Sequence, residues 1–304
     1  MLLRPSNNCM ASASYVFSGE AMRLYVKLAE SHSHSRGPWA AILSRVAALR
    51  LPAGAHVLDL ASGHGEPALT LARALPSLRI TSTDVSADMV AAAGRRLGGL
   101  PNVDLRVADM CDLRAFPDDS VDCVVSCYGL MFAPDKAQAL AEVHRVLKPG
   151  GCIVATYWLQ LRLMALAKEV MTAVYDGPPP PLPPQNPLAL REPGAFDALA
   201  TGAGLVMRES SEGPGGGYPF HLGSDEEEAF RLCTFASAEI IAERDPAPHP
   251  KARAAFAAAA KAIMQPPEGD AAAPASVVPG NRFVIAVAAK PGGGLGGPQE
   301  AMRK

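Results

Sequence analysis

The fold of this chain is decided by the stretch Val57-Leu-Asp-Leu-Ala-Ser-Gly-His-Gly-Glu-Pro-Ala68. The apolar run at residues 56–60 predicts a short buried strand. A glycine loop follows this run, and a helix is predicted after the loop over residues 67–75. A strand, a glycine loop and a helix in this order are typical of the first unit of a nucleotide-binding α/β sheet.

The alternation of strand and helix continues through the middle of the chain. Further strands are predicted at residues 78–83, 103–107, 121–127 and 152–157. Asp84 and Asp109 stand just beyond the first two of these strands. Repeated βα units imply a parallel sheet with helices on both faces. We therefore predict an α/β fold of the Rossmann-like, doubly wound class, with a mostly parallel sheet.

Polar residues mark the starts of several predicted helices. Ser86 can accept an orphan backbone N–H of the helix that follows the second strand. Asp135 with Gln138, and Ser224 with Glu227, have the spacing of capping boxes. These signals predict one helix before the fifth strand and another in the last third of the chain.

The regular pattern breaks after residue 157. The remaining elements are predicted as helices at 161–175, 196–204, 224–243 and 251–264, strands at 205–209 and 282–289, and a flexible turn at 213–217. We divide the chain into an N-terminal helical or lid segment (1–50), a main domain (51–290) and a disordered glycine-rich tail (291–304). The main domain is expected to contain a helical cap insertion at about 177–280, which opens with a proline-rich stretch.

Composition excludes some classes of protein. The chain has 304 residues and a net charge of −2, without the basic excess of a nucleic-acid-binding protein. No apolar run approaches the roughly 20 residues that span a bilayer. Six scattered cysteines predict reduced thiols and a cytoplasmic location, although residues 1–19 faintly resemble a transit peptide. His32 and His34 are interpreted as solvated loop residues, and no metal site is expected.

The glycine loop must be assigned to a type of nucleotide. Gly63-His-Gly65-Glu-Pro-Ala68 matches the dinucleotide fingerprint, and Asp84 lies about 20 residues further on. A pyrophosphate needs free N–H groups at the helix start. Glu66 and Asp59 add carboxylates there instead, and Pro67 lacks an N–H. These residues suit a ligand without phosphate but with a cationic amine, which describes S-adenosylmethionine (SAM).

Three segments carry a family resemblance. The stretch from Val57 to Gly65 resembles the first motif of class I SAM-dependent methyltransferases. Phe116-Pro-Asp-Asp-Ser-Val-Asp122 and Glu142-Val-His-Arg-Val-Leu-Lys-Pro-Gly-Gly151 are similar to the ubiquinone/menaquinone-biosynthesis branch of that class. The resemblance covers residues 53–157, departs at Ser62-Gly-His where Cys-Gly-Thr is commoner, and implies a seven-stranded sheet of order 3-2-1-4-5-7-6.

The resemblance also implies roles for residues. Donor-binding positions are Asp59, Ala61, Gly63, Gly65, Asp84, Val85, Met89, Asp109, Met110, Ser126 and Tyr128, with Cys127 beside them. Asp59 and the loop backbone would hold the methionine end of SAM, and Asp84 the ribose. Asp109 would accept from the adenine amino group, while Met110 would contact the ring. Residues 126–128 would line the pocket beside the sulfonium.

The acceptor and the catalytic group are less determined. His64, Glu66 and Tyr128 are candidates for a base, as are His32 or His34 if the N-terminal segment folds over as a lid. Aromatic residues of that segment, Tyr15, Phe17, Tyr25 and Trp39, suggest an apolar or ring-bearing small-molecule acceptor, and ordinary packing explains them equally well. Whether oxygen, nitrogen or carbon is methylated, and the oligomeric state, stay open.

Two other functions remain possible at this point. An NAD(P)-dependent oxidoreductase could use a similar sheet, although Tyr128 is followed by Phe132 and not by the Lys of a Tyr-x-x-x-Lys pair. A non-catalytic SAM-binding protein would keep the donor site without turnover.

Overall fold

The computed structural model describes residues 19–292, and residues Tyr15 and Phe17 and most of the predicted tail lie outside them. The strands are β1 (His56–Leu60), β2 (Arg79–Asp84), β3 (Val103–Val107), β4 (Val121–Cys127), β5 (Leu147–Gln160), β6 (Val206–Glu212), β7 (Tyr218–His221) and β8 (Val277–Ala289). The α-helices are α1 (Gly19–Ala29), α2 (Pro38–Ala48), α3 (Ala68–Ala74), α4 (Ala87–Leu97), α5 (Lys136–Val146), α6 (Leu163–Val174), α7 (Ala195–Gly202), α8 (Glu226–Thr234), α9 (Ala238–Arg244) and α10 (Pro250–Ile263). Short 3-10 helices are η2 (Glu30–Ser33), η3 (Leu130–Phe132) and η4 (Phe235–Ser237).

The sheet has the strand order β3-β2-β1-β4-β5-β8-β6. Strands β1 to β5 pair in parallel, while β8 lies antiparallel between β5 and β6. The predicted order 3-2-1-4-5-7-6 is confirmed, with β8 in the position predicted for strand 7. The additional strand β7 pairs with the early part of β8 and was not predicted.

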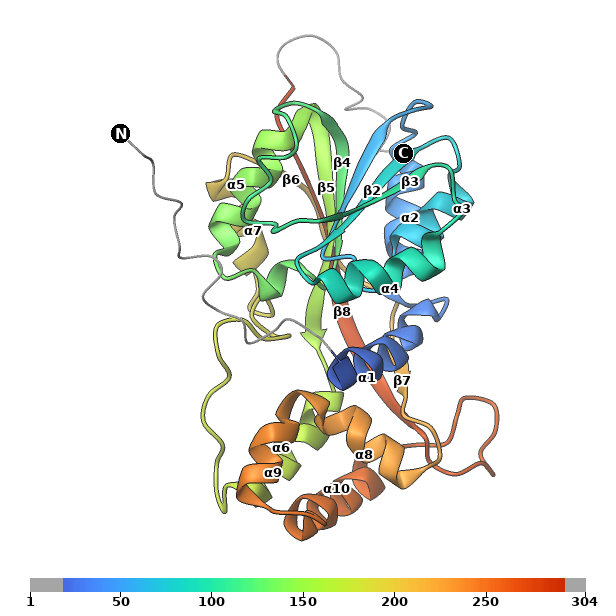
Figure 1. The fold of residues 1–304 in the computed structure, drawn as a ribbon, viewed down its shortest axis with the longest axis vertical. Helices are drawn as coiled ribbons and strands as arrows, with labels where there is room; N and C mark the ends of the chain where they lie inside the picture. The colour runs from blue at the N-terminus through green and yellow to red at the C-terminus, as the bar shows by residue number, and fades with distance from the viewer. Residues whose placement is uncertain (1–18, 293–304) are drawn as a thin grey trace.

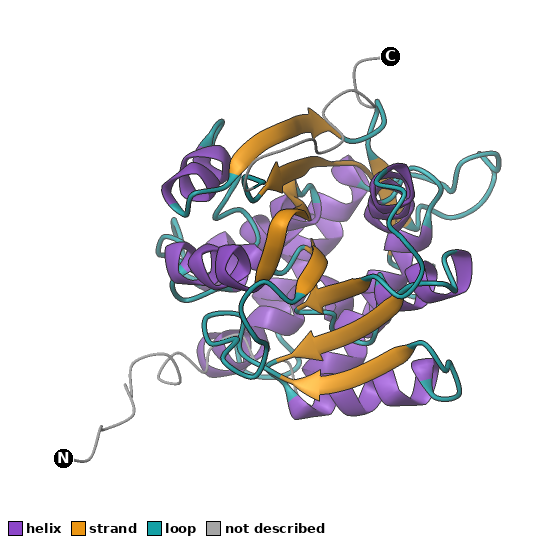
Figure 2. Ribbon diagram, turned by 90° about the horizontal axis from the view of Figure 1, so that it is seen from above, coloured by secondary structure: helices purple, strands orange, loops and turns teal. Residues whose placement is uncertain are grey.

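Helices cover both faces of this sheet (Figure 1). Helices α2, α3 and α4 lie on one side, and α5 and α7 on the other. All five residues of β1 are buried, as expected for a central parallel strand that is covered twice. Viewed from above, the strands form one twisted layer between helices (Figure 2).

A second group of helices lies beyond one end of the sheet, at the bottom of Figure 1. Helix α6 packs against α8, α9 and α10. Phe230 of α8 and Phe256 of α10 are buried there, with ring centroids 5.6 Å apart. Helix α1 contacts α8, and Lys27 pairs with Glu228 across this contact. We call α6, α8, α9 and α10 the helical group.

Two details of helix capping differ from the prediction. Asp135 does cap α5, but the Gln138 side chain donates to the carbonyl of Cys111, so only half of the capping box forms. In the last third of the chain the N-cap is Asp225, which accepts from the backbone N–H of Glu228. The pair Ser224 and Glu227 was therefore the wrong choice.

The helix predicted over residues 224–243 is also divided, into α8, η4 and α9. The turn predicted at residues 213–217 leads directly into β7, whose Tyr218 and Phe220 are buried. Within residues 19–292, no helix is long and apolar enough to cross a membrane.

Candidate functional site

The glycine loop between β1 and α3 follows the carboxyl end of the first strand, where open α/β sheets bind ligands. Gly63 and Gly65 have φ values of +55° and +100°, which favour glycine. A Cβ at Gly65 would lie 2.8 Å from Cδ1 of Leu97, so this glycine also lets α4 approach the loop. At Gly63 the nearest atom to such a Cβ is Cε1 of Tyr25, 3.8 Å away.

The N-terminus of α3 has no free donor for a phosphate. The N–H of Ala68 donates to Oδ2 of Asp59 over 3.1 Å, and the N–H of Thr70 to Oε2 of Glu66 over 3.2 Å. The N–H of Leu69 donates to the carbonyl of Gly65. Pro67, at the N-cap, has no N–H at all. The helix start that a pyrophosphate would use is therefore already saturated.

Three carboxylates lie buried around the loop. Asp59 is 0% exposed, Glu66 7% and Asp84 9%. Burial raises the pKa of Asp59 well above its usual range, and Glu66 and Asp84 add to that rise. Burial also raises the pKa values of Glu66 and Asp84. Within residues 19–292, Glu66 is the only one of the three with a cationic partner, Arg96 at 3.2 Å, so the site is electrostatically prepared for a further cation.

Asp84 organises the loop as well as ending β2. Its Oδ2 accepts from the N–H of Gly63 over 2.9 Å, and its Oδ1 from the N–H of Ser86 over 2.9 Å. Ser86 in turn caps α4 by accepting from the N–H of Met89, as predicted. Met89 is buried beside this turn, whereas the side chain of Val85 is 55% exposed.

Asp109 and Met110 occupy the loop after β3 and are both half-buried. Oδ1 of Asp109 accepts from the N–H of Cys111 over 2.8 Å, and Met110 packs against the core. Each keeps a position at the same edge of the sheet as Asp84, because β3 pairs in parallel with β2.

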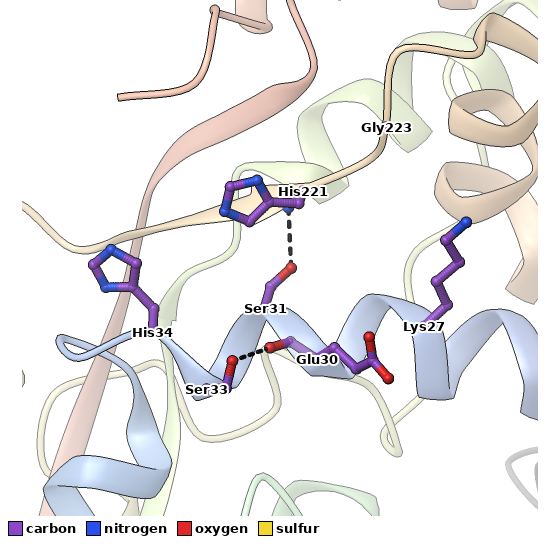
Figure 3. Close-up of a pocket in the computed structure, with 7 residues that line it drawn as sticks. All are labelled: Lys27, Glu30, Ser31, Ser33, His34, His221 and Gly223. Carbon is purple, nitrogen blue, oxygen red and sulfur yellow. Dashed lines mark hydrogen bonds between the residues drawn. The ribbon is translucent and has the colours of Figure 1, made fainter. Parts of the chain in front are cut away.

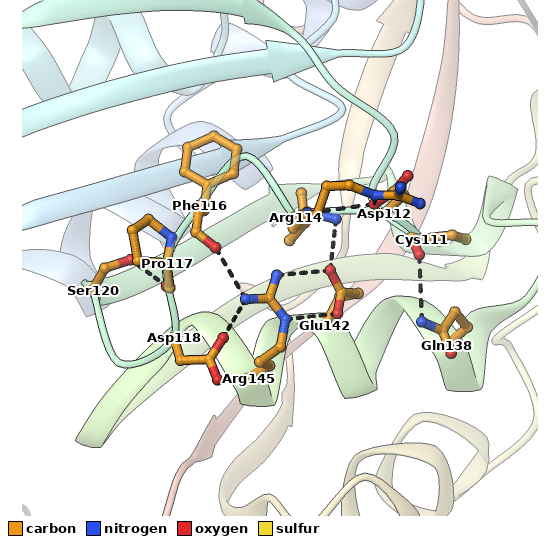
Figure 4. A network of polar contacts seen from close by, with 11 residues as sticks. Cys111, Asp112, Arg114, Phe116, Pro117, Asp118, Ser120, Gln138, Glu142 and Arg145 are labelled. Carbon is orange, nitrogen blue, oxygen red and sulfur yellow. Dashed lines mark hydrogen bonds and ion pairs between the residues drawn. The ribbon is translucent and has the colours of Figure 1, made fainter. Parts of the chain in front are cut away.

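A polar network supports the loop after β3 and joins two of the family-like motifs, residues 116–122 and 142–151 (Figure 4). Oε2 of Glu142 accepts from the N–H of Leu113 over 2.6 Å. Arg145 binds Glu142 and donates to the carbonyl of Phe116 and to Asp118. These motif residues therefore brace the loop rather than enter the site.

Ser126 and Cys127 at the end of β4 and Tyr128, which follows it, have different environments. Ser126 is 0% exposed and donates to the carbonyl of Leu60 over 3.2 Å. The thiol of Cys127 accepts from Thr156, and burial raises its pKa, so it stays protonated. Tyr128 follows with a φ of +55°, an uncommon conformation for a bulky residue.

Tyr128 belongs to a buried group of rings that we call the aromatic cluster. Its members are His32, Trp39, Tyr128, Trp158, Tyr218, Phe220 and Phe283. Tyr128 stacks on Trp158 with centroids 4.0 Å apart. His32 is 5% exposed and contacts five of these rings, so its interpretation as a solvated residue was wrong. The sequence held no signal for this contact, because its partners are distant along the chain.

The candidate bases are not equivalent. Glu66 accepts from Thr70 and pairs with Arg96, so its oxygens are engaged. His64 is 4% exposed, and its Nε2 has no hydrogen-bond partner among the described residues. Burial lowers the pKa of His64 to about 4, so this ring is neutral at pH 7 and able to accept a proton or a hydrogen bond. His34, in contrast, lies apart from these groups.

An open cavity of about 460 Å³ lies between η2 and β7 (Figure 3). It is lined by Lys27, Glu30, Ser31, Ser33, His34, His221 and Gly223. Ser31 accepts from the N–H of His221, which ties the two walls together. Glu30, Ser31 and Ser33 of η2 thus line this cavity, whereas His32 of the same turn belongs to the aromatic cluster. No group of three or more metal-ligating side chains occurs in residues 19–292.

Comparison with known proteins finds relatives of the middle of the chain, from β1 to β5. Residues 58–155 match the family model described as a methyltransferase domain. The ubiquinone/menaquinone biosynthesis C-methyltransferase of Geobacter sulfurreducens is 39% identical over 110 residues, 35% of this chain and 43% of that protein. The demethylmenaquinone methyltransferase of Lactiplantibacillus plantarum is 38% identical over 117 residues, 36% of this chain and 47% of that protein. The chain therefore spans less than half the length of these relatives.

Solved structures agree on the fold. The YcgJ protein of Bacillus subtilis has a TM-score of 0.53 at 20% identity, covering 84% of this chain and 100% of that one. A [4+2]-cyclase, SpnF, has a TM-score of 0.50 at 20% identity, covering 89% of this chain and 95% of that one. The resemblance to class I SAM-dependent methyltransferases is confirmed in sequence and in fold. The cyclase illustrates that the fold by itself does not determine the reaction.

Proposed function

We propose that this chain binds SAM at the glycine loop and transfers its methyl group to a small-molecule acceptor. One observation carries the proposal. Buried carboxylates of Asp59 and Glu66 take the N–H groups that a dinucleotide phosphate would need, and they create a site that favours a cation. The match of residues 58–155 to a methyltransferase domain supports the same ligand.

The residues at the loop fit this donor. Oδ1 of Asp59 is buried without a hydrogen-bond partner in the described chain and suits an ammonium group. The carboxylate oxygens of Asp84 accept from the backbone N–H groups of Gly63 and Ser86, and further lone pairs remain for ribose hydroxyls. We propose that Asp109 and Met110, in the loop after β3, hold the adenine. When bound, SAM supplies a methyl group that its positive sulfur already activates.

The chain's own contribution is mainly binding and orientation. Fixing two reactants in an attacking geometry can lower a barrier by about 7–11 kcal/mol. For the acceptor we propose an apolar or ring-bearing molecule. Tyr128 and the aromatic cluster lie at the end of β4, and β4 pairs with β1, the strand that leads into the glycine loop. Contacts of the helical group with α1, which reaches Gly63 through Tyr25, support a role for that group in shaping the acceptor pocket.

Thermal shift in the presence of single ligands tests the donor. S-Adenosylhomocysteine at 100 times its dissociation constant should stabilise the protein by about 2.7 kcal/mol. NAD and NADP should leave the melting temperature unchanged, because α3 has no free N–H for a pyrophosphate. A shift with NAD(P) and none with S-adenosylhomocysteine would favour an oxidoreductase. Tight S-adenosylhomocysteine binding without turnover on any acceptor would favour a non-catalytic SAM-binding protein.

A further inference from the structure

Three buried polar side chains form a hydrogen-bonded chain through the aromatic cluster. The hydroxyls of Tyr128 and Tyr218 lie 3.1 Å apart, and the Tyr218 hydroxyl lies 2.8 Å from Nδ1 of His32. Exposure is 5% for Tyr128, 0% for Tyr218 and 5% for His32. The three come from the end of β4, from β7 and from η2, so the fold brings distant segments together to form this chain.

Ring packing alone does not require these polar atoms. Phenylalanine at positions 128 and 218 would keep the stacking on Trp158 and the edge contacts with Phe283. It would also avoid burying two hydroxyl groups. Burial of a hydroxyl group costs free energy unless the group is hydrogen-bonded. Tyr128 is further held at a φ of +55°, a conformation that costs free energy and persists where the surroundings impose it.

The donor-to-acceptor direction of this hydrogen-bonded chain depends on the protonation state of its last member, His32. Burial lowers the pKa of His32 to about 3, and His64 across Trp39 contributes to this shift. His32 is therefore neutral at pH 7, with one nitrogen free to accept. The other titratable groups near the two tyrosines are Tyr25 and Cys127, whose pKa values burial raises, so they are neutral too.

We propose that Tyr128, Tyr218 and His32 form a proton path that leads from a hydroxyl-bearing acceptor to the imidazole. Tyr218 donates to Nδ1 of His32, and Tyr128 donates to Tyr218. The Tyr128 oxygen is then left to accept the acceptor's own hydrogen. This inference rests on the proposed methyl transfer and adds to it the kind of acceptor and the route of its proton.

Atoms and charges balance along this path. The acceptor oxygen forms its bond to the methyl carbon while the carbon–sulfur bond breaks and leaves its electron pair on sulfur. The acceptor's proton passes to Tyr128, the proton of Tyr128 to Tyr218, and that of Tyr218 to His32. The positive charge lost at sulfur reappears on the imidazolium, so the net charge of the buried site is unchanged.

The proton can leave on the other side of η2. Ser31 and Ser33, which flank His32 in the sequence, line the open cavity of Figure 3. The low pKa of His32 means that the imidazolium releases its proton readily. His32 itself is 5% exposed, and its neighbours in η2 form the wall between it and this cavity.

Nitrogen NMR of histidine-labelled protein saturated with S-adenosylhomocysteine tests the direction of the path without any acceptor. We expect His32 to be neutral at pH 7, with the proton on Nε2 and a hydrogen-bonded, unprotonated Nδ1. Tyr218→Phe should shift the Nδ1 resonance toward that of a free imidazole nitrogen. A proton on Nδ1 would reverse the path and overturn the proposal.

Kinetics separates a proton path from a structural contact. His32→Gln keeps a hydrogen-bond acceptor for Tyr218 but has no affinity for a proton. With a hydroxyl-bearing acceptor from a panel, we expect kcat to fall at least tenfold, while KM and S-adenosylhomocysteine affinity stay within twofold. Unchanged kcat in His32→Gln would overturn the path. Absence of both donor binding and turnover in the wild type would instead contradict the proposed function, and the same NMR measurement on the ligand-free protein would then decide the direction of the hydrogen-bonded chain.

Discussion

The two halves of the sheet's carboxyl edge are built in different ways. On the β1–β2–β3 side, polar contacts join residues that are close in sequence, such as Gly63 to Asp84, 21 positions apart. On the β4–β5–β8 side, Tyr128 bonds to Tyr218 across 90 positions, and Tyr218 to His32 across 186. The half proposed to bind the donor is thus specified by local backbone geometry, and the half proposed to bind the acceptor by long-range packing of side chains.

This difference gives the two halves different freedom to vary. A backbone loop with positive φ at Gly63 and Gly65 tolerates few changes, which keeps a motif recognisable. Side chains in an aromatic cluster can be exchanged in groups as long as volume and hydrogen bonds are kept. The family match covers residues 58–155, which include β4, Tyr128 and most of β5, but neither η2 nor β7, which supply His32 and Tyr218.

The largest expected effect is on stability, in the helical group. Phe256→Ala should remove a buried ring that packs on Phe230 and destabilise the protein by about 3–5 kcal/mol. If the helical group does not support the donor site, the Kd for S-adenosylhomocysteine, measured by calorimetry well below the melting temperature, should stay within twofold. Phe256→Leu serves as the matched control with a smaller cavity. A tenfold weaker Kd in either variant would show that the helical group supports the donor site.

Asp84→Ala should produce the next largest effect, on binding. Loss of hydrogen bonds between a carboxylate and the ribose costs about 1.5–3 kcal/mol each, so affinity should fall at least tenfold. Stability should fall as well, because the N–H groups of Gly63 and Ser86 lose their acceptor. Asp84→Asn keeps an acceptor oxygen and should recover much of the stability but less of the affinity. Affinity within twofold of wild type would refute the ribose assignment.

The sequence could predict the first half well and the second half poorly. Alternating strands and helices predicted a mostly parallel α/β sheet, and the family resemblance implied its strand order. The glycine loop with Asp84 predicted a donor site at the edge of that sheet. Strand β7 was missed because its four residues follow a glycine-rich turn and carry no period of their own. The burial of His32 could not be foreseen, since its partners Tyr128 and Tyr218 are brought to it only by tertiary packing.

Asp59→Asn should have a smaller effect than Asp84→Ala. It should raise the stability of the protein and lower its affinity for SAM. Burial raises the pKa of Asp59, so the folded state holds this proton more tightly than the unfolded state. For such an acid, stability is lost as pH rises from the unfolded pKa, about 3.9, through the raised folded pKa. Asparagine removes this loss and keeps an acceptor for the N–H of Ala68.

We therefore expect Asp59→Asn to melt higher than wild type at pH 7, by about 2–4 °C for each kcal/mol recovered. The difference should vanish at low pH, where Asp59 is protonated in both states. Affinity for SAM should fall several-fold, since the cation loses a carboxylate. Differential scanning calorimetry over a pH series checks the first part, and calorimetric titration with SAM the second. A variant that is less stable at pH 7 would contradict this account of the buried carboxylate.

The smallest expected effect belongs to Asp109, at the outer end of the donor half. Its carboxylate is half-buried and already accepts from the N–H of Cys111. Asp109→Ala should therefore remove one hydrogen bond to the adenine amino group, a loss of about 0.5–1.5 kcal/mol, while Met110 keeps its contact with the ring. Because a loop disturbance alone could produce a change of this size, the ligand must be varied together with the residue.

S-Inosylhomocysteine, in which a carbonyl oxygen replaces the adenine amino group, provides that second variation. Wild type should prefer S-adenosylhomocysteine, since the carbonyl cannot donate to Asp109 and would face its charge. In Asp109→Ala the preference should shrink several-fold, because neither ligand then meets a carboxylate. An undiminished preference would show that the amino group is recognised elsewhere, and Asp109 would then serve only to hold the turn at Cys111.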